Sequence, residues 1–350
     1  MCDKAFESQS RGLMEHALVP VSVHVIKAGK LRRYHGIPLW KQLLDIPTVA
    51  KNIRDIFLIG IGFFQSLVLL CRFKPDVVFA KGGYVCLPLG YAARILGVPL
   101  VIHDSDTRPG LTNKTLSRFA RSIATGSPLE NYSYPKEKTV YTGVPIDPAF
   151  HMLSPEEVHQ AKHDIGIVDL SKPLVVVTGG GLGSENINRG IVAIAERLIA
   201  DGYAIYHVTG KRHAERVKRD APEHADYHIV PFVYKDMVKV LGAADVVVSR
   251  GSATFLQELA ALAKPTVIVP AGHLGDQVKN AAVYEAAHAA YVVSDEEVRA
   301  GLGLYDAIRS CISQQKETKA MTERFHAFAK TDAAIDVAHL IVSAVEKSDQ

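Results

Sequence analysis

The chain has 350 residues, 48% of them hydrophobic and 22% charged, so it is long enough for two globular domains with a core each. Its net charge of +3 is too small to indicate a nucleic-acid partner, and no block of Lys and Arg interleaved with aromatic residues occurs. The charge is uneven: residues 1–80 hold eleven Lys and Arg against six Asp and Glu. This excess of basic residues predicts that the N-terminal half faces the anionic surface of a partner.

The four cysteines, Cys2, Cys71, Cys86 and Cys311, lack the spacing of metal ligands. They indicate free thiols in a reducing cytoplasm and no metal site. The first ten residues are mixed and polar rather than basic and then apolar, so no signal peptide is expected.

From Leu174 onward, short β-branched runs alternate with longer patterns of helical spacing, which predicts a parallel sheet with crossover helices. The first half repeats the alternation more loosely. Strands are expected at residues 21–26, 77–80, 100–102, 174–177, 204–208, 246–248 and 266–269, and helices at residues 187–198 and 255–263. The Gly and Pro residues of 142–148 indicate a linker, so we expect two domains, 1–149 and 150–350.

Residues 56–70 form a strongly apolar segment that is shorter than the roughly 20 residues of a membrane-spanning helix. Basic residues lie on both sides of it: Lys51, Arg54, Arg72 and Lys74. Two interpretations stay open. The segment either lies against a membrane, with the basic side chains meeting anionic headgroups, or is a buried crossover helix.

The glycine-rich sequence GGGLGS at residues 179–184 follows a predicted strand and precedes a predicted helix. Glycines let backbone N–H groups approach a diphosphate, and the helix N-terminus adds partial positive charge. The pattern favours phosphate binding over a simple tight connection.

A second turn of this design, RGSAT at residues 250–254, follows the strand at 246–248. Thr254 is a candidate N-cap, with Gln257 completing a capping box. Glu258 would then lie near the first helical turn, where it either interacts with the helix dipole alone or accepts both ribose hydroxyls of a nucleotide. Gln277 and Asn280, in a polar loop expected at residues 270–280, suit sugar hydroxyls because amides both donate and accept.

In the first half, His103 ends a predicted strand and a polar run that includes Asp106 follows it. Ligands of open parallel sheets bind at the carboxyl ends of strands, so His103 is a candidate general base with a nearby carboxylate, or else a structural histidine. Gly82, Gly83 and Tyr84, after the preceding strand, could bring backbone close to an acceptor diphosphate.

Together these pieces resemble glycosyltransferase family 28 along nearly the whole chain. Residues 74–78 (KPDVV) and 82–85 (GGYV) look like two sequences of the family, and residues 109–113 (PGLTN) are similar to its Gly-Leu-Thr-Asn. Residues 250–258 and 276–281 fit its uridine and sugar loops. The resemblance is greatest to members that transfer GlcNAc from UDP-GlcNAc to undecaprenyl-diphosphoryl-MurNAc-pentapeptide.

This resemblance implies the GT-B fold, an α/β architecture of two Rossmann-like doubly wound parallel-sheet domains facing a cleft. A final helix, at about residues 334–347, would pack back on the N-terminal domain. The implied activity is inverting hexosyl transfer in peptidoglycan synthesis, at the cytoplasmic face of the cell membrane, with no cofactor and no metal. Loop amides and helix N-termini would stabilise the leaving UDP.

The resemblance also implies a set of site residues. Glu258 would hold the ribose, residues 232–234 would lie near uracil, and Gln277 and Asn280 would lie near the GlcNAc hydroxyls. His103 is the expected catalytic residue, and Gly82, Gly83 and Tyr84 the expected acceptor side. The expected donor-binding residues are Gly180, Gly181, Gly183, Arg250, Ser252, Ala253, Thr254, Phe255, Glu258, Gln277, Asn280 and Asp106.

Several positions depart from the family pattern. The family begins with a strand and a Gly-Gly-Thr-Gly-Gly-His loop, and this sequence starts after both, which we interpret as a truncated N-terminus. Asp106 stands for an Asn, Gly181 for a Ser, and Asp147 for an Arg that holds a phosphate. Three alternatives therefore stay open: a relative that glycosylates another lipid such as diacylglycerol, a non-catalytic UDP-sugar-binding partner protein, and a UDP-GlcNAc epimerase.

Overall fold

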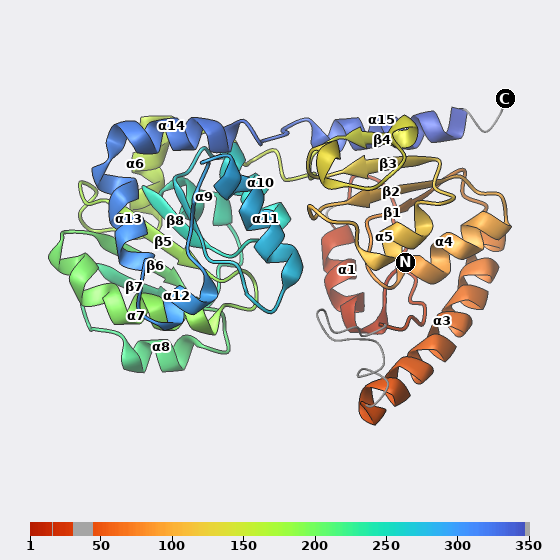
Figure 1. The fold of residues 1–350 in the computed structure, drawn as a ribbon, viewed down its shortest axis with the longest axis horizontal. Coiled ribbons are helices and arrows are strands. Elements are labelled where there is room, and N and C mark those ends of the chain that lie inside the picture. Colours follow the sequence, from red (N-terminus) through yellow and green to blue (C-terminus); the bar gives the residue numbers. More distant parts are fainter. Residues whose placement is uncertain (16, 31–44, 347–350) are drawn as a thin grey trace. The chain divides into compact units, whose positions relative to one another are not determined.

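The structure is a computed structural model that describes residues 1–15, 17–30 and 45–346. These residues form two compact units (Figure 1). The first comprises residues up to Thr142 together with those from Ile335 on, and the second is Gly143–Ala334. The division thus falls a few residues before the expected position at Ala149, because residues 143–149 pack with the second unit, where Phe150 and Ile146 join the core.

The first unit contains a four-stranded parallel sheet in the order β1-β2-β3-β4. Its strands are β1 (Val78–Ala80), β2 (Leu100–Asp104), β3 (Ser122–Thr125) and β4 (Thr139–Tyr141). Its helices are η1 (Lys4–Phe6), α1 (Glu7–Met14), α3 (Ile46–Phe73), α4 (Cys86–Ile95), α5 (Leu111–Leu116), η2 (Leu129–Asn131), η3 (Lys136–Lys138) and α15 (Ala333–Glu346). Side chains of α3, α4 and α5 pack on the sheet residues Val78, Leu100 and Ile123 to form its core.

Two expectations for this unit are corrected. Residues 21–26 do not form a strand of the sheet, because only Val25 makes a β-bridge, with Cys2. The apolar segment at 56–70 belongs to α3, which has 28 residues: Asp45 caps its start by accepting from the Thr48 amide, and Lys74 ends it in the left-handed conformation. For α15, the described bounds are close to those expected, and Lys347 lies outside the described residues.

The second unit contains a six-stranded parallel sheet in the order β10-β9-β8-β5-β6-β7. Its strands are β5 (Leu174–Thr178), β6 (Ala204–Val208), β7 (Tyr227–Val230), β8 (Val246–Ser249), β9 (Thr266–Ile268) and β10 (Tyr291–Val292). Its helices are α6 (Pro155–Asp164), α7 (Glu185–Ala200), α8 (Ala214–Asp220), α9 (Met237–Gly242), α10 (Ala253–Ala261), α11 (Gly275–Ala286), α12 (Asp295–Arg299), α13 (Leu304–Ser313) and α14 (Gln315–His326).

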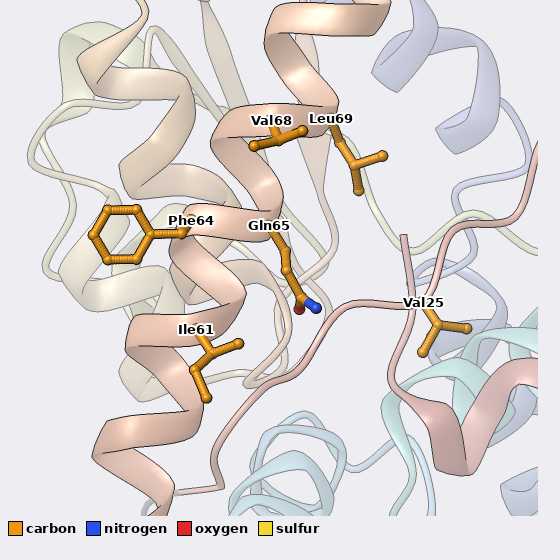
Figure 2. A pocket seen from close by; sticks show the side chains of 6 residues that line it. All are labelled: Val25, Ile61, Phe64, Gln65, Val68 and Leu69. Atoms are coloured by element: carbon orange, nitrogen blue, oxygen red, sulfur yellow. The ribbon is translucent and has the colours of Figure 1, made fainter.

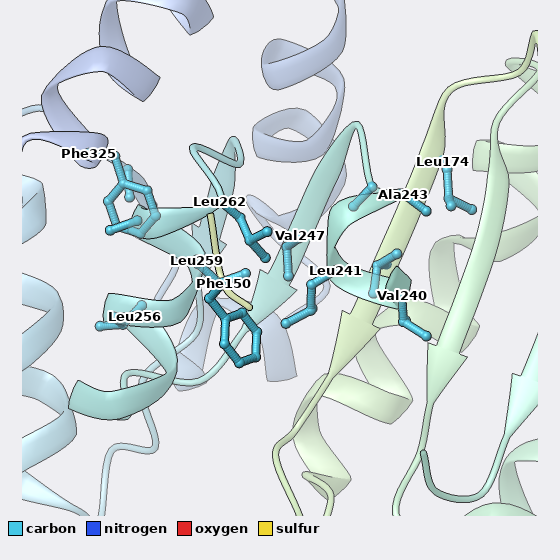
Figure 3. Packing of buried hydrophobic residues seen from close by; sticks show 14 of the residues in the cluster. Phe150, Leu174, Val240, Leu241, Ala243, Val247, Leu256, Leu259, Leu262 and Phe325 are labelled. Atoms are coloured by element: carbon cyan, nitrogen blue, oxygen red, sulfur yellow. The ribbon is translucent and has the colours of Figure 1, made fainter. Parts of the chain in front are cut away.

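Alternation along the strands divides the core of this unit between the two faces of the sheet. Leu174 and Val176 of β5 join a cluster with Leu256, Leu259 and Phe325 of α10 and α14 (Figure 3). The intervening valines of β5 face the other side, among side chains of α7 and α13. Helices thus cover both faces of a sheet whose order reverses between β5 and β8, as in a doubly wound Rossmann fold.

Candidate nucleotide-sugar site

One pocket of about 370 Å³ lies at the carboxyl ends of β5 and β8 in the second unit. These two neighbouring strands flank the point where the strand order reverses, which is where open parallel sheets bind ligands. The pocket is lined by Gly179, Gly180, Gly181, Leu182, Arg250, Ser252, Thr254, Phe255, Glu258 and Gln277. It therefore brings together residues from three sequence-predicted segments that are up to about a hundred residues apart.

The glycine-rich loop at 179–184 forms one wall. Gly180 and Gly183 have positive φ values of 78° and 76°, which favour glycine. A Cβ atom at Gly183 would stand 2.1 Å from the carbonyl oxygen of Thr209, whereas a Cβ at Gly181 would meet nothing within 4 Å. Gly183 thus packs against the backbone of Thr209, whereas Gly181 lines the pocket. The loop lies just before the N-terminus of α7, where backbone N–H groups can bind a diphosphate.

The turn after β8 forms a second part of the pocket wall. Its helix, α10, begins at Ala253, two residues before the expected start, and its N-cap is Ser252, with no side-chain capping bond. The expected Thr254 cap and capping box are therefore wrong, since Thr254 is already helical and lines the pocket. Ala253 opens the same turn but does not line the pocket.

Gln277 connects this turn to α11. Residues 275–280 belong to this helix and not to the expected loop, so Gln277 and Asn280 are held on regular structure. The amide oxygen of Gln277 accepts from Arg250 Nε at 3.1 Å and from the Ala271 amide at 3.3 Å. Arg250 is thereby fixed on the pocket wall, and its Nη2 is buried without a hydrogen-bond partner among the described residues.

Asn280 has a different position from the one expected. It is 1% exposed and does not line the pocket, and its Nδ2 donates to the carbonyl oxygen of Gly251 at 3.0 Å. A Cβ at Gly251 would lie 2.5 Å from the Gln277 carbonyl, so the turn and α11 approach closely. Asn280 thus supports the turn from behind.

Glu258 is the carboxylate of the pocket. Its pKa is raised to about 7, chiefly by burial and to a smaller extent by the negative charge of Asp147. The sequence resemblance implies an Arg at position 147, so an acidic residue stands where a basic one was expected. A carboxylate here can accept two hydroxyl groups of a ribose, while the glycine-loop amides can bind phosphate.

Residues 232–234 follow the end of β7 in the same unit. Phe232 and Tyr234 meet edge to face, with ring centroids 4.9 Å apart, and Lys211 Nζ lies 4.6 Å from the Tyr234 ring centroid. Tyr234 is 75% exposed and is available for stacking. These residues do not line the pocket described above.

In the first unit, the predicted acceptor residues lie at the carboxyl ends of β1 and β2. Gly82 and Gly83 have positive φ values of 88° and 83° and lead through Tyr84 into α4. Gly82 packs on Asn113, whose Nδ2 donates to the carbonyl oxygen of His103 at 2.9 Å. Asn113 therefore contacts both loops, by packing against Gly82 and by a hydrogen bond to His103.

His103 is fully buried, and its Nδ1 lies 3.3 Å from the hydroxyl of Ser105. The carboxylate of the next residue, Asp104, accepts instead from Tyr134 at 2.6 Å and from the Gly110 amide at 3.2 Å. Burial raises the Asp104 pKa to about 6. Asp106 accepts from the Tyr132 hydroxyl through its backbone carbonyl at 2.6 Å, so two tyrosines that the sequence analysis missed hold this loop.

The chain thus has two parallel-sheet units, one of which holds a pocket at the point where the strand order reverses, an arrangement typical of nucleotide-binding proteins. Models of the glycosyltransferase family 28 N-terminal and C-terminal domains match residues 19–125 and 174–337. The chain is 33% identical over 330 residues to the UDP-N-acetylglucosamine–N-acetylmuramyl-(pentapeptide) pyrophosphoryl-undecaprenol N-acetylglucosamine transferase of Listeria monocytogenes serotype 4a, spanning 91% of this chain and 88% of that protein. The enzyme of the same name from Clostridium kluyveri is 31% identical, over 93% and 85%.

Solved structures agree on the fold. MurG of Acinetobacter baumannii has a TM-score of 0.68 at 20% identity, covering 97% of this chain and 93% of that one. The UDP-GlcNAc 2-epimerase of Neisseria meningitidis, bound to UDP-GlcNAc, has a TM-score of 0.61 at 16% identity, covering 82% and 81%. The chain belongs to glycosyltransferase family 28.

Proposed function

We propose that the chain is an inverting transferase that moves GlcNAc from UDP-GlcNAc to lipid-linked MurNAc-pentapeptide, the lipid I to lipid II step of peptidoglycan synthesis. The observation that carries the proposal is the pocket, which combines a glycine loop, Arg250 and Glu258 in a chain 33% identical to a transferase named for this reaction. UDP-GlcNAc has a diphosphate, a ribose and a sugar, and the pocket offers a chemically suited group to each.

In this proposal, the backbone N–H of Gly181 binds the diphosphate and Glu258 holds the ribose hydroxyls. Gly180 shapes the loop, because its own N–H donates to Thr178 Oγ1 at 3.1 Å. Thr254 and Phe255, which line the pocket, contact the nucleotide, and Gln277 orients the sugar through its side-chain amide. An acceptor hydroxyl attacks the anomeric carbon with inversion while UDP leaves, stabilised by backbone N–H groups and not by a metal ion. A chelator should therefore leave the turnover rate unchanged.

His103 is the proposed general base. Its imidazole is fully buried beside Ser105, so the loop between β2 and α5 must move before Nε2 or Nδ1 can contact an acceptor hydroxyl. A His103→Asn variant should lose turnover by about 10²-fold, the size of a general-base contribution, with unchanged UDP-GlcNAc affinity. Unchanged turnover would remove His103 from the mechanism.

Helix α3 supports a peripheral position at an anionic membrane surface. By length and composition alone it could cross a membrane, so the expectation that it is too short was wrong. Its buried residues are Thr48, Asp55, Gly62, Ser66 and Leu70, whereas most of its large apolar side chains are exposed. The exposed ones are Ile46, Ile53, Ile56, Phe57, Ile61, Phe64, Val68 and Phe73.

The protein-facing side of α3 explains why we place it on a membrane and not across one. Ideal Cβ atoms at Gly29 and Gly62 would lie 2.0 Å and 1.8 Å from the backbone oxygens of Asp55 and Lys27, so the N-terminal segment packs directly on this helix. Gln65 points toward that segment, where it accepts from the Lys27 amide at 2.7 Å, and Phe64 points away (Figure 2). One side is thus packed on protein and the other is apolar, which suits a helix lying in an interface.

Vesicle flotation tests this membrane proposal. Wild-type chain should bind vesicles that contain anionic lipid at low salt, because exposed Lys51, Arg54, Arg72 and Lys74 flank the apolar face, and should bind less at high salt. Phe57→Ser together with Phe64→Ser should weaken binding. A matched control, Leu182→Ser, changes an exposed apolar residue of the other unit and should have no effect. Equal binding by all three proteins would overturn the proposal.

Calorimetric titration and a transfer assay test the activity. The chain should bind UDP-GlcNAc more tightly than UDP-glucose, and Glu258→Ala should lose most of this affinity. Transfer to a lipid-linked MurNAc-pentapeptide, but not to diacylglycerol, is the expected outcome. Transfer to diacylglycerol alone would identify a different acceptor, and conversion of UDP-GlcNAc without an acceptor would identify an epimerase.

A non-catalytic UDP-sugar-binding protein is the second candidate. The carboxylate of Asp147 near Glu258, in place of the family's Arg, favours it, because a negative charge cannot hold a phosphate. Tight UDP-GlcNAc binding with no transfer to any acceptor would establish this candidate. Asp147→Arg should then strengthen UDP binding.

A further inference from the structure

A chain of buried hydrogen bonds runs beneath the glycine loop of the second unit. Tyr227 of β7 contacts His207 of β6 through its hydroxyl and Nδ1, 2.9 Å apart. His207 Nε2 lies 3.0 Å from Asn188 Oδ1, and Asn188 Nδ2 donates to the carbonyl oxygen of Thr209 at 3.0 Å. His207, Asn188 and Thr209 are each at most 1% exposed, so water does not compete with these bonds.

The direction of these bonds is fixed from one end. A carbonyl oxygen only accepts, so Asn188 must present its NH₂ group to Thr209 and its oxygen to His207. His207 therefore carries its proton on Nε2, and Nδ1 accepts from the Tyr227 hydroxyl. This arrangement requires a neutral imidazole, and burial lowers the His207 pKa to about 3, so the ring stays neutral at ordinary pH.

The end of this chain touches the glycine loop. A Cβ atom at Gly183 would lie only 2.1 Å from the carbonyl oxygen of Thr209. A Cβ atom at Gly210 would likewise lie 2.6 Å from the carbonyl oxygen of Leu182, so the two backbone segments are in close contact. Asn188 also belongs to the first turns of α7, where its backbone N–H donates to the carbonyl oxygen of Ser184 at 3.0 Å. Asn188 thus connects the N-terminal end of α7, which follows the glycine loop, to the Thr209 carbonyl group, which contacts Gly183 of that loop.

We propose that Asn188 and His207 are positioning residues that hold the glycine loop in the conformation that binds the donor diphosphate. Neither lines the pocket, so both act through the backbone of Thr209 and Gly183. The inference rests on the proposed function, because it takes the loop's ligand to be the diphosphate of a UDP-sugar. A histidine inside the buried strand at 204–208 was the signal in the sequence, since an unpaired buried imidazole is costly.

The test compares UDP with uridine, which lacks the phosphates. Asn188→Ala should raise the UDP dissociation constant about five- to tenfold, the factor typical of a lost hydrogen bond, and should leave uridine within about twofold. His207→Phe should act in the same direction, because it frees the Asn188 amide to rotate. If Asn188→Ala does not fold, His207→Phe carries the test.

Tyr227→Phe is the matched control. It removes the hydroxyl group at the end of the hydrogen-bond series farthest from the glycine loop. The variant should therefore have lower thermal stability but unchanged UDP affinity. Hydrogen exchange gives a readout without ligand: the amides of residues 180–184 should exchange faster in Asn188→Ala than in Tyr227→Phe.

Three outcomes separate the proposals. If the variants bind UDP as wild type does, or lose UDP and uridine equally, the positioning role is wrong while the donor site stands. If wild type binds neither compound, the proposed function fails, and this inference fails with it. Selective loss of UDP in Asn188→Ala and His207→Phe, with Tyr227→Phe unaffected, is the expected result.

Discussion

Helices α7 and α3 are both long and contain many apolar residues, yet they bury different kinds of side chain. In α7, Ile187, Ile191, Ala195 and Leu198 are fully buried against the six-stranded sheet. In α3, the buried residues are Thr48, Asp55, Gly62, Ser66 and Leu70, four of them small or polar, whereas most of the large apolar residues are exposed. The difference shows that the partner surface decides which face is buried: a sheet accepts branched side chains, whereas the close backbone at Lys27 and Gly29 accepts only small contacts.

Truncating one apolar side chain in each helix tests this difference most directly, because the two variants should lose very different amounts of unfolding free energy. Ile191→Ala removes a fully buried side chain, so the second unit should lose about 2–5 kcal/mol of unfolding free energy. Phe57→Ala, at a position 71% exposed, should change stability by less than about 0.5 kcal/mol. Urea unfolding followed by circular dichroism measures both. A large loss for Phe57→Ala would mean that this face of α3 is packed in solution.

The same contrast explains which elements the sequence could predict. The strand at 204–208 and the helix over 187–198 were confirmed, because their periodic patterns match burial on a sheet. In residues 56–70 nearly every side chain is apolar, so no period could show which face is buried. The expected strand at 21–26 was wrong for a related reason: its β-branched content indicates extended backbone, but a strand also needs a partner, and only Cys2 pairs with it.

The candidate site was predictable in its glycines and its carboxylate, but not in its supports. Gly180, Arg250 and Glu258 lie in one pocket because they follow neighbouring strands, which a strand-and-turn pattern can reveal. The helix bounds near Thr254 and Gln277 were wrong, because caps and loops depend on tertiary contacts such as that of Gly251 with Gln277. The bonds of Asn188 join segments that no local pattern connects.

Two glycines of one loop sharpen the contrast between enclosed and open positions. Gly183→Ala places a Cβ against the Thr209 carbonyl at a positive φ, so UDP binding should weaken more than about tenfold, the effect of roughly 1.4 kcal/mol or more of strain. Gly181→Ser, which installs the family's residue in open space, should keep UDP affinity within about twofold. Calorimetry on the two variants decides this. Equal losses would mean that the loop rearranges on binding.

Burial also distinguishes two carboxylates of this unit by their pKa values, and we expect it to have a smaller effect on ligand affinity. The enclosed Glu258 has a pKa raised to about 7, whereas hydrogen bonds to Ser294 lower the pKa of the exposed Glu297. Ribose hydroxyls donate to an ionised carboxylate, so UDP-GlcNAc should bind more tightly as pH rises through about 7, by roughly tenfold between pH 6 and pH 8.

Asp147→Asn tests the cause of this pH dependence. Removing the Asp147 charge should lower the Glu258 pKa and move the midpoint of the affinity profile to lower pH, because the ionised form is then less opposed. Glu297→Gln, at an exposed helix cap of the same unit, should leave the profile unchanged. A profile that does not move in Asp147→Asn would show that burial alone sets the pKa, and one that is flat in wild type would show that Glu258 does not hold the ribose.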